Sequence, residues 1–114
     1  MSEPALVQVN CDPRATIVTI MCSEFDFQRT KQFRDEMAGA SLGDAKLPLI
    51  LDLTQVRFMP SPTLGALVEL RSRFAREKRP LKLAGIQPAI VQVLQTTGML
   101  SLFEVCPSVA GAMG

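Results

Sequence analysis

Two hydroxyl groups and two prolines alternate in the segment Pro60-Ser61-Pro62-Thr63. An apolar run precedes this segment and a helical pattern follows it, so the segment would present a hydroxyl at the N-terminus of a helix. A phosphate placed there is stabilised by free backbone amides and by the helix dipole. The chemistry that these residues could support is therefore phosphorylation used as a switch. The simpler alternative, which we favour, is that Ser61 caps the helix and Pro62 takes its first position.

Two aspartates are the other candidates for chemistry. Asp26 precedes a second helical pattern, and we expect it to cap that helix, with a direct contact to a partner as the alternative. Asp52 lies at the end of an apolar run, where a carboxylate needs amide or hydroxyl donors that neighbouring loops can supply. No second catalytic group lies near Asp52 in the sequence, so a general-acid role is the weaker interpretation.

The residue types exclude most chemistry beyond this. The chain has no histidine, which removes the commonest general base and the commonest metal ligand. Cys11, Cys22 and Cys106 lie outside any Cys-x-x-Cys spacing and read as free thiols. The net charge is +1, and glutamates dilute the basic segment 71–79, which we expect to be a solvated face rather than a nucleic-acid site. We therefore expect no enzyme, metal, cofactor or nucleic-acid partner.

Length and composition describe the scaffold that must position these residues. The 114 residues, 47% hydrophobic and 20% charged, suffice for one folded domain spanning 1–114. No window approaches the ~20 continuous apolar residues of a membrane span. Residues 1–4 lack the basic-then-apolar layout of a signal peptide. We expect a cytoplasmic protein that does not insert into membranes.

Strand and helix patterns alternate along the chain. The run 47–53 is almost wholly apolar, which is typical of a central strand covered on both faces. The predicted strands are 5–10, 15–22, 47–53, 81–84 and 103–106. The predicted helices run from 26 or 27 to 40, from 62 to 78, from 88 to a cap at 98, and from 108 to 113. This order predicts an α/β fold with a mixed sheet of four to five strands and about four helices.

Five segments, which correspond to four motifs, occur in an order that belongs to a known family. Segment 23–26 reads Ser-Glu-Phe-Asp, similar to Gly-Glu-Leu-Asp, and 51–58 is similar to Leu-Asp-Leu-Ser-x-Val-x-Phe. Segment 59–65 stands where the family has Met/Ile-Asp-Ser-Ser/Thr-Gly-Leu-Gly, and 93–99 with 102–105 are similar to its closing element. With these motifs in order over nearly the whole chain, the sequence resembles the STAS domain of sulfate transporters and anti-sigma factor antagonists. The resemblance implies a single STAS-like domain.

The departures from the family motif concern its phosphorylation site. If the chain is like the anti-sigma factor antagonists, the resemblance implies that the second hydroxyl-bearing residue of the motif Asp-Ser-Ser/Thr-Gly is the phosphorylated one. That position is Pro62 here, the aspartate position is Pro60 and the glycine position is Thr63. Pro62 excludes the usual modification, because it has no hydroxyl. Ser61 and Thr63 remain as alternative phosphoacceptors.

The resemblance implies a non-enzymatic protein-interaction module similar to an anti-sigma factor antagonist. Its partner would be a regulatory protein such as an anti-sigma factor or a kinase-like regulator. The alternative is a structural or accessory STAS subunit of a stressosome-like or membrane transport assembly, and whether the chain forms a homo-oligomer stays open. The expected partner-binding residues are Asp26, Phe27, Met59, Ser61, Pro62, Thr63 and Leu64.

Overall fold

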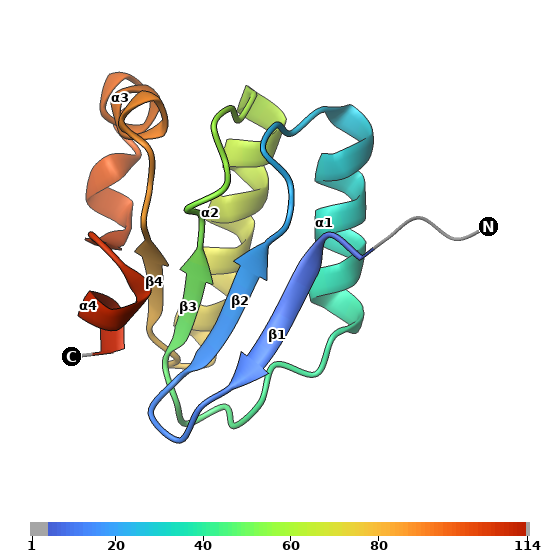
Figure 1. The fold of residues 1–114 in the computed structure, drawn as a ribbon, viewed down its shortest axis with the longest axis vertical. Coiled ribbons are helices and arrows are strands. Elements are labelled where there is room, and N and C mark those ends of the chain that lie inside the picture. The colour runs from blue at the N-terminus through green and yellow to red at the C-terminus, as the bar shows by residue number, and fades with distance from the viewer. Residues whose placement is uncertain (1–4, 114) are drawn as a thin grey trace.

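A mixed five-stranded sheet forms the centre of the fold, in the computed structural model that describes residues 5–113 (Figure 1). The strands lie in chain order across the sheet: β1 (Val7–Cys11), β2 (Thr16–Ile20), β3 (Leu49–Asp52), β4 (Leu81–Ala84) and β5 (Glu104–Cys106). β1 runs antiparallel to β2, and every later pair is parallel. The predicted mixed sheet is confirmed, with five strands.

Helices cover the two faces of this sheet unequally. The helices are α1 (Phe27–Gly39), α2 (Ser61–Arg76), α3 (Pro88–Thr96) and α4 (Val109–Met113), with a single 3₁₀ turn, η1 (Leu100–Leu102). α1 and α2 lie side by side on one face (Figure 1). The short helix α4 covers part of the opposite face, where Ala112 packs with Ile50 and Ala84.

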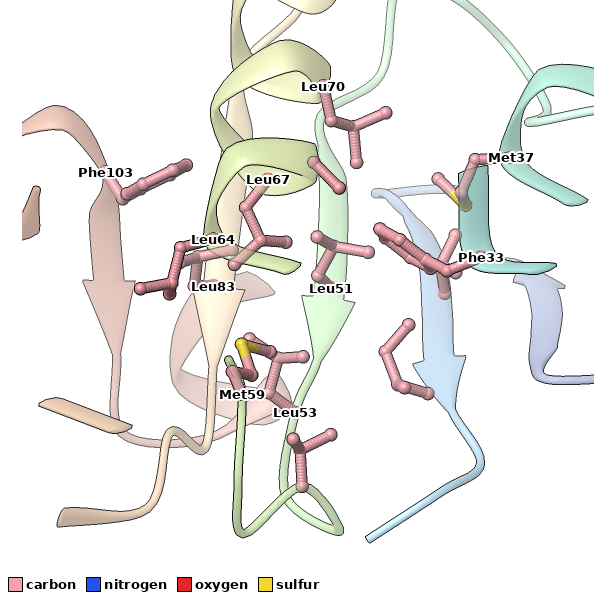
Figure 2. Close-up of a cluster of buried hydrophobic side chains, with 14 of the residues drawn as sticks. Phe33, Met37, Leu51, Leu53, Met59, Leu64, Leu67, Leu70, Leu83 and Phe103 are labelled. Atoms are coloured by element: carbon pink, nitrogen blue, oxygen red, sulfur yellow. The ribbon is translucent and has the colours of Figure 1, made fainter. Parts of the chain in front are cut away.

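The position of β3 at the centre of the sheet, with both faces covered, explains why its sequence is almost wholly apolar. Leu49 and Leu51 point into the main core toward α1 and α2, while Ile50 points to the opposite face under α4, and all three are fully buried. In Figure 2, Leu51 lies between Phe33 of α1 and Leu67 of α2. The prediction of a strand covered on both faces is confirmed.

Some predicted boundaries differ from the observed ones by a few residues. The strand predicted to end at Asn10 continues through Cys11, because the hairpin turn is closed by two backbone bonds between Asp12 and Ala15. The helix predicted to end at Lys78 ends at Arg76, and Lys78 has a left-handed φ of 57°. Gly98, with φ of 72°, follows the C-cap of α3 as predicted.

One residue of the basic segment contradicts its predicted solvation. Arg79 is buried, and its guanidinium donates to the carbonyls of Leu47 at 2.8 Å and Leu42 at 2.6 Å. It also lies over the ring of Phe74, with 5.5 Å from its central carbon to the ring centroid. Burial lowers the pKa of Arg79 from its usual high value. Its role is to close the end of the core rather than to face solvent.

The parallel arrangement gathers three loops at one edge. β2, β3 and β4 point the same way, so the loops that follow them lie together at the carboxyl ends of the strands (Figure 1). Residues 1–4, where we find no signal-peptide pattern, and residue 114 lie outside the described residues. Between residues 5 and 113, no helix has the length and hydrophobicity to cross a membrane.

Candidate functional site

Two loops pair with each other beyond the end of the sheet. The Ser23 carbonyl accepts the amides of Arg57 at 2.6 Å and Phe58 at 3.3 Å, and the Phe25 amide donates to the Phe58 carbonyl at 3.1 Å. These bonds form an isolated parallel bridge between Glu24 and Phe58. The loop after β2 and the loop after β3 are thereby fixed side by side. This pairing brings the expected site residues at 26–27 near those at 59–64.

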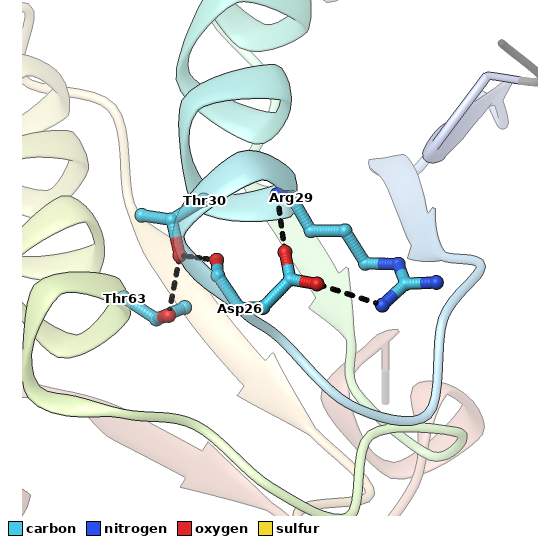
Figure 3. Close-up of polar contacts among 4 residues, drawn as sticks. All are labelled: Asp26, Arg29, Thr30 and Thr63. Carbon is cyan, nitrogen blue, oxygen red and sulfur yellow. Dashed lines mark hydrogen bonds and ion pairs between the residues drawn. The ribbon is translucent and has the colours of Figure 1, made fainter.

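Asp26 caps α1, as the sequence predicts. Its Oδ1 accepts the Arg29 amide at 2.8 Å, and its backbone carbonyl accepts the Thr30 amide at 2.9 Å. Its Oδ2 accepts from the Arg29 guanidinium at 3.2 Å (Figure 3). The Asp26 side chain nevertheless remains 57% exposed. The same residue therefore holds the helix start and presents a carboxylate at the surface.

The predicted cap of α2 is wrong. Ser61 is the first helical residue, and the N-cap is Pro60, which provides no side-chain hydrogen bond. Pro60 has extended backbone (φ −75°, ψ 169°), and its carbonyl accepts the amides of Thr63 at 3.0 Å and Leu64 at 3.3 Å. Pro62 consequently occupies the second helical position rather than the first. The Ser61 hydroxyl is exposed and has no capping role.

The start of α2 offers little to an anion. Free first-turn amides are what stabilise a phosphate at a helix N-terminus. Pro62 has no amide, and the Thr63 amide is already bonded to the Pro60 carbonyl. Among residues 5–113, the Ser61 amide has no protein acceptor and is the one first-turn donor left for an anion.

Three of the expected contact residues lie inside the protein. Met59, Thr63 and Leu64 are all buried, and Figure 2 shows Met59 and Leu64 within the main core. Thr63 Oγ1 lies 2.7 Å from Thr30 Oγ1 (Figure 3). In this conformation the Thr63 hydroxyl is not accessible to a kinase, and these three residues can support a surface without forming it.

Exposed apolar side chains also lie at this edge, and one of them, Phe58, is not among the expected contact residues. Phe27, the first residue of α1, is 79% exposed, and Phe58 is 55% exposed. Met21, the residue after β2, is also exposed. Phe58 belongs to a recognised motif, but nothing local distinguishes it from the buried Val56 and Met59. Its exposure follows from the non-local bridge to Glu24.

Asp52 finds its donors within its own loop. Its Oδ1 accepts the Thr54 amide at 3.0 Å and also the Thr54 hydroxyl. Gln87, from the loop before α3, donates to the Thr54 carbonyl at 2.7 Å. The expectation that this carboxylate finds an amide or hydroxyl donor is confirmed, but the donors belong to Thr54 of its own loop and not to a neighbouring loop. Asp52 stabilises the turn that leads to the paired loops.

An open groove of about 680 Å³ flanks the first turns of α1. Cys22, Ser23, Asp26 and Arg29 are among the residues that line it. Burial raises the pKa of the Cys22 thiol, so the thiol is protonated at neutral pH and is a poor nucleophile. In the part of the chain that the structure describes, no three acidic or cysteine side chains cluster to hold a metal ion.

Solved proteins of known class share this fold. The chain superimposes on an anti-sigma-factor antagonist (STAS) domain protein from Planctomyces limnophilus with a TM-score of 0.84 and 19% identity, covering 97% of each chain. It matches the phosphorylated form of the Bacillus cell fate determinant SpoIIAA with a TM-score of 0.69 and 18% identity, covering 94% of this chain and 96% of SpoIIAA.

A transporter-related protein gives a similar match. A sulfate transporter family protein from Wolinella succinogenes superimposes with a TM-score of 0.74 and 18% identity, covering 87% of this chain and 81% of that protein. Among curated proteins, none matches the sequence. The sequence itself matches the STAS domain family over residues 7–112. The chain belongs to the STAS domain family, and its fold is the STAS fold.

Proposed function

We propose that this chain is a non-enzymatic interaction module of the anti-sigma factor antagonist type. It binds a regulatory protein, such as an anti-sigma factor or a kinase-like regulator, in the cytoplasm. The contact surface consists of Asp26, Phe27, Phe58, Ser61 and Pro62. We call these five residues the loop-edge surface. Met59, Thr63 and Leu64 support it from below.

The exposure of two phenylalanines on fixed backbone supports this proposal most directly. Phe27 follows Asp26, the cap of α1, and the backbone of Phe58 makes two hydrogen bonds to the loop after β2. Exposed aromatic rings are unfavourable in water but are frequent anchors of protein interfaces. Because their backbone is already ordered, little conformational entropy is lost when a partner covers them.

Regulation by phosphate at the usual family position is excluded by Pro62, and Ser61 is a weak substitute. A phosphate on Ser61 would find one free first-turn amide, since Pro62 has none and the Thr63 amide is already bonded. The surface therefore binds without a phosphate switch in its second helix. Control of the interaction lies in the partner or in the amounts of the two proteins.

Binding of a kinase-type anti-sigma factor to purified variants tests the proposal. Calorimetry should show that Phe27→Ala and Phe58→Ala each weaken binding about tenfold or more. Val105→Ala is the control, because Val105 is also exposed but lies on the edge strand β5. Equal losses for all three variants, or a loss for Val105→Ala alone, would place the contact elsewhere.

The second candidate is a structural subunit of a larger assembly, such as a stressosome-like core or a transport complex. It is favoured by the match to a sulfate transporter family protein and by the two prolines that stiffen the start of α2. Light scattering on the purified chain distinguishes the two. A monomer that binds a regulator one to one supports the first, and a stable oligomer supports the second.

A further inference from the structure

Two threonine hydroxyls meet in the interior between the first turns of α1 and α2. Thr30 is 2% exposed and Thr63 is 0% exposed. Their Oγ1 atoms are 2.7 Å apart, and Thr30 Oγ1 also donates to the Asp26 carbonyl at 2.7 Å. Figure 3 shows the two contacts meeting at the Thr30 hydroxyl, one toward Thr63 of α2 and the other toward Asp26 at the start of α1. Buried hydroxyls need such partners, because water cannot supply them.

The number of hydroxyl protons determines which group donates in each of these two hydrogen bonds. Each threonine hydroxyl carries one proton, and a carbonyl oxygen can only accept. Thr30 therefore donates its proton to the Asp26 carbonyl. The bond between the two hydroxyls must use the proton of Thr63. The Thr63 hydroxyl therefore donates to the Thr30 hydroxyl, which in turn donates to the Asp26 carbonyl.

These two hydrogen bonds link the α1 and α2 parts of the loop-edge surface from inside the protein. Asp26 precedes Phe27, and Thr63 follows Pro62. The first and last residues of this hydrogen-bonded series therefore lie next to exposed contact residues. An ion pair between the two helices, from Arg34 to Glu69 at 3.3 Å, is exposed and lies further along them. A buried hydrogen bond is stronger and more sensitive to geometry than an exposed pair.

We propose that Thr30 and Thr63 are positioning residues that set the spacing between the α1 and α2 parts of the loop-edge surface. The consequence for binding rests on the function proposed above. The coupling between the starts of α1 and α2 through the Thr30–Thr63 hydrogen bond, called the internal coupling below, does not. Position 63 is glycine in the family motif, and glycine has no side chain to donate. In this chain, an internal hydrogen bond fixes the surface next to the proline that occupies the usual phosphoacceptor position.

The internal coupling can be measured without any partner. Hydrogen–deuterium exchange of the purified full chain should show faster exchange of the Arg29 and Thr30 amides in Thr63→Val, although the substitution is on the other helix. We expect about fivefold, the factor for loss of roughly one intramolecular hydrogen bond. Thr63→Ser, which keeps the hydroxyl, should retain wild-type rates at both amides.

Thr96→Val is the matched control. Thr96 Oγ1 also donates to a carbonyl four residues earlier, that of Gln92 at 2.8 Å, but on the exposed side of α3. It should leave the α1 amides unchanged. Unchanged α1 amides in Thr63→Val, with faster exchange only in the first turn of α2, would overturn the proposal. If Thr63→Val does not fold, Thr63→Ala replaces it in the same comparison.

Binding of the kinase-type anti-sigma factor separates this inference from the proposed function. The double variant Thr30→Val/Thr63→Val leaves no unpaired hydroxyl, and we expect it to keep its denaturation midpoint and to bind about tenfold more weakly. Wild-type affinity in this variant would refute the positioning role. If wild-type protein does not bind that regulator at all, the proposed function fails, and the exchange measurement still decides the coupling.

Discussion

The two helices that carry the loop-edge surface begin in different ways. α1 begins after Asp26, whose carboxylate and carbonyl accept the amides of Arg29 and Thr30. α2 begins after Pro60, which offers only its carbonyl, and Pro62 in the first turn has no amide to offer. Side-chain hydrogen bonds hold the first start, and the restricted φ of two prolines holds the second.

This difference teaches that the two parts of one surface can be ordered by unrelated means. The start of α1 depends on a hydrogen-bonded cap, so a single side-chain substitution can loosen it. The start of α2 depends on backbone stiffness, which reduces the entropy of the unfolded chain rather than adding a contact. The Thr30–Thr63 bond is the buried polar link between the two starts.

The largest expected effect is chemical and concerns the α2 start. Pro62→Ser adds a hydroxyl and a free amide at the position where the family motif has its phosphoacceptor. After incubation with ATP and a kinase-type anti-sigma factor, mass spectrometry should find phosphate at position 62 of the variant and none there in wild type. Pro62→Ala is the control. Stoichiometric phosphate on wild-type Ser61 would show that one free amide suffices.

The next effect breaks the link between the two starts. Thr30→Val removes the acceptor of a buried proton and should lower the free energy of unfolding by about 1–3 kcal/mol. Thr63→Val should cost less, because Thr30 keeps its bond to the Asp26 carbonyl. Urea denaturation of both variants measures the order. Equal losses, or a larger loss for Thr63→Val, would show that Thr30 donates its proton to Thr63 and not to the Asp26 carbonyl.

A smaller loss is expected at the α1 start. Asp26→Ala removes the N-cap and should reduce the free energy of unfolding by about 0.5–2 kcal/mol. Asp35→Ala is the matched control, because Asp35 is an exposed aspartate in the middle of the same helix. Denaturation midpoints that fall equally for both variants would mean that charge, and not the cap, accounts for the change.

The smallest effect tests the corrected start of α2. Ser61→Ala should change the free energy of unfolding by no more than about 0.5 kcal/mol, as is usual for surface positions without a cap. The Ser61 hydroxyl has no capping bond, so nothing is lost with it. A drop of the size expected for Asp26→Ala would show that Ser61 caps α2 in solution.

The same contrast explains what the sequence could predict. The Asp26 cap depends on residues three positions apart, so a local pattern predicts it. The apolar run of β3 likewise indicates by itself that the strand is buried. The Ser61 cap failed because the Pro60 carbonyl took the capping role. The exposure of Phe58 beside the buried Met59 depends on a bridge to Glu24, more than thirty residues away. No local pattern contains that information.

The position of α4 has a consequence for how the molecule reaches its folded state. Ala112 covers Ile50 and Ala84 on the second face of the sheet, yet more than half of the chain separates it from Ile50. Such a contact closes a long loop, whose entropic cost delays it relative to local contacts. The main core can therefore condense while the Ile50 face is still wet. We expect that face to be where partly folded molecules adhere to one another and where a chaperone would bind.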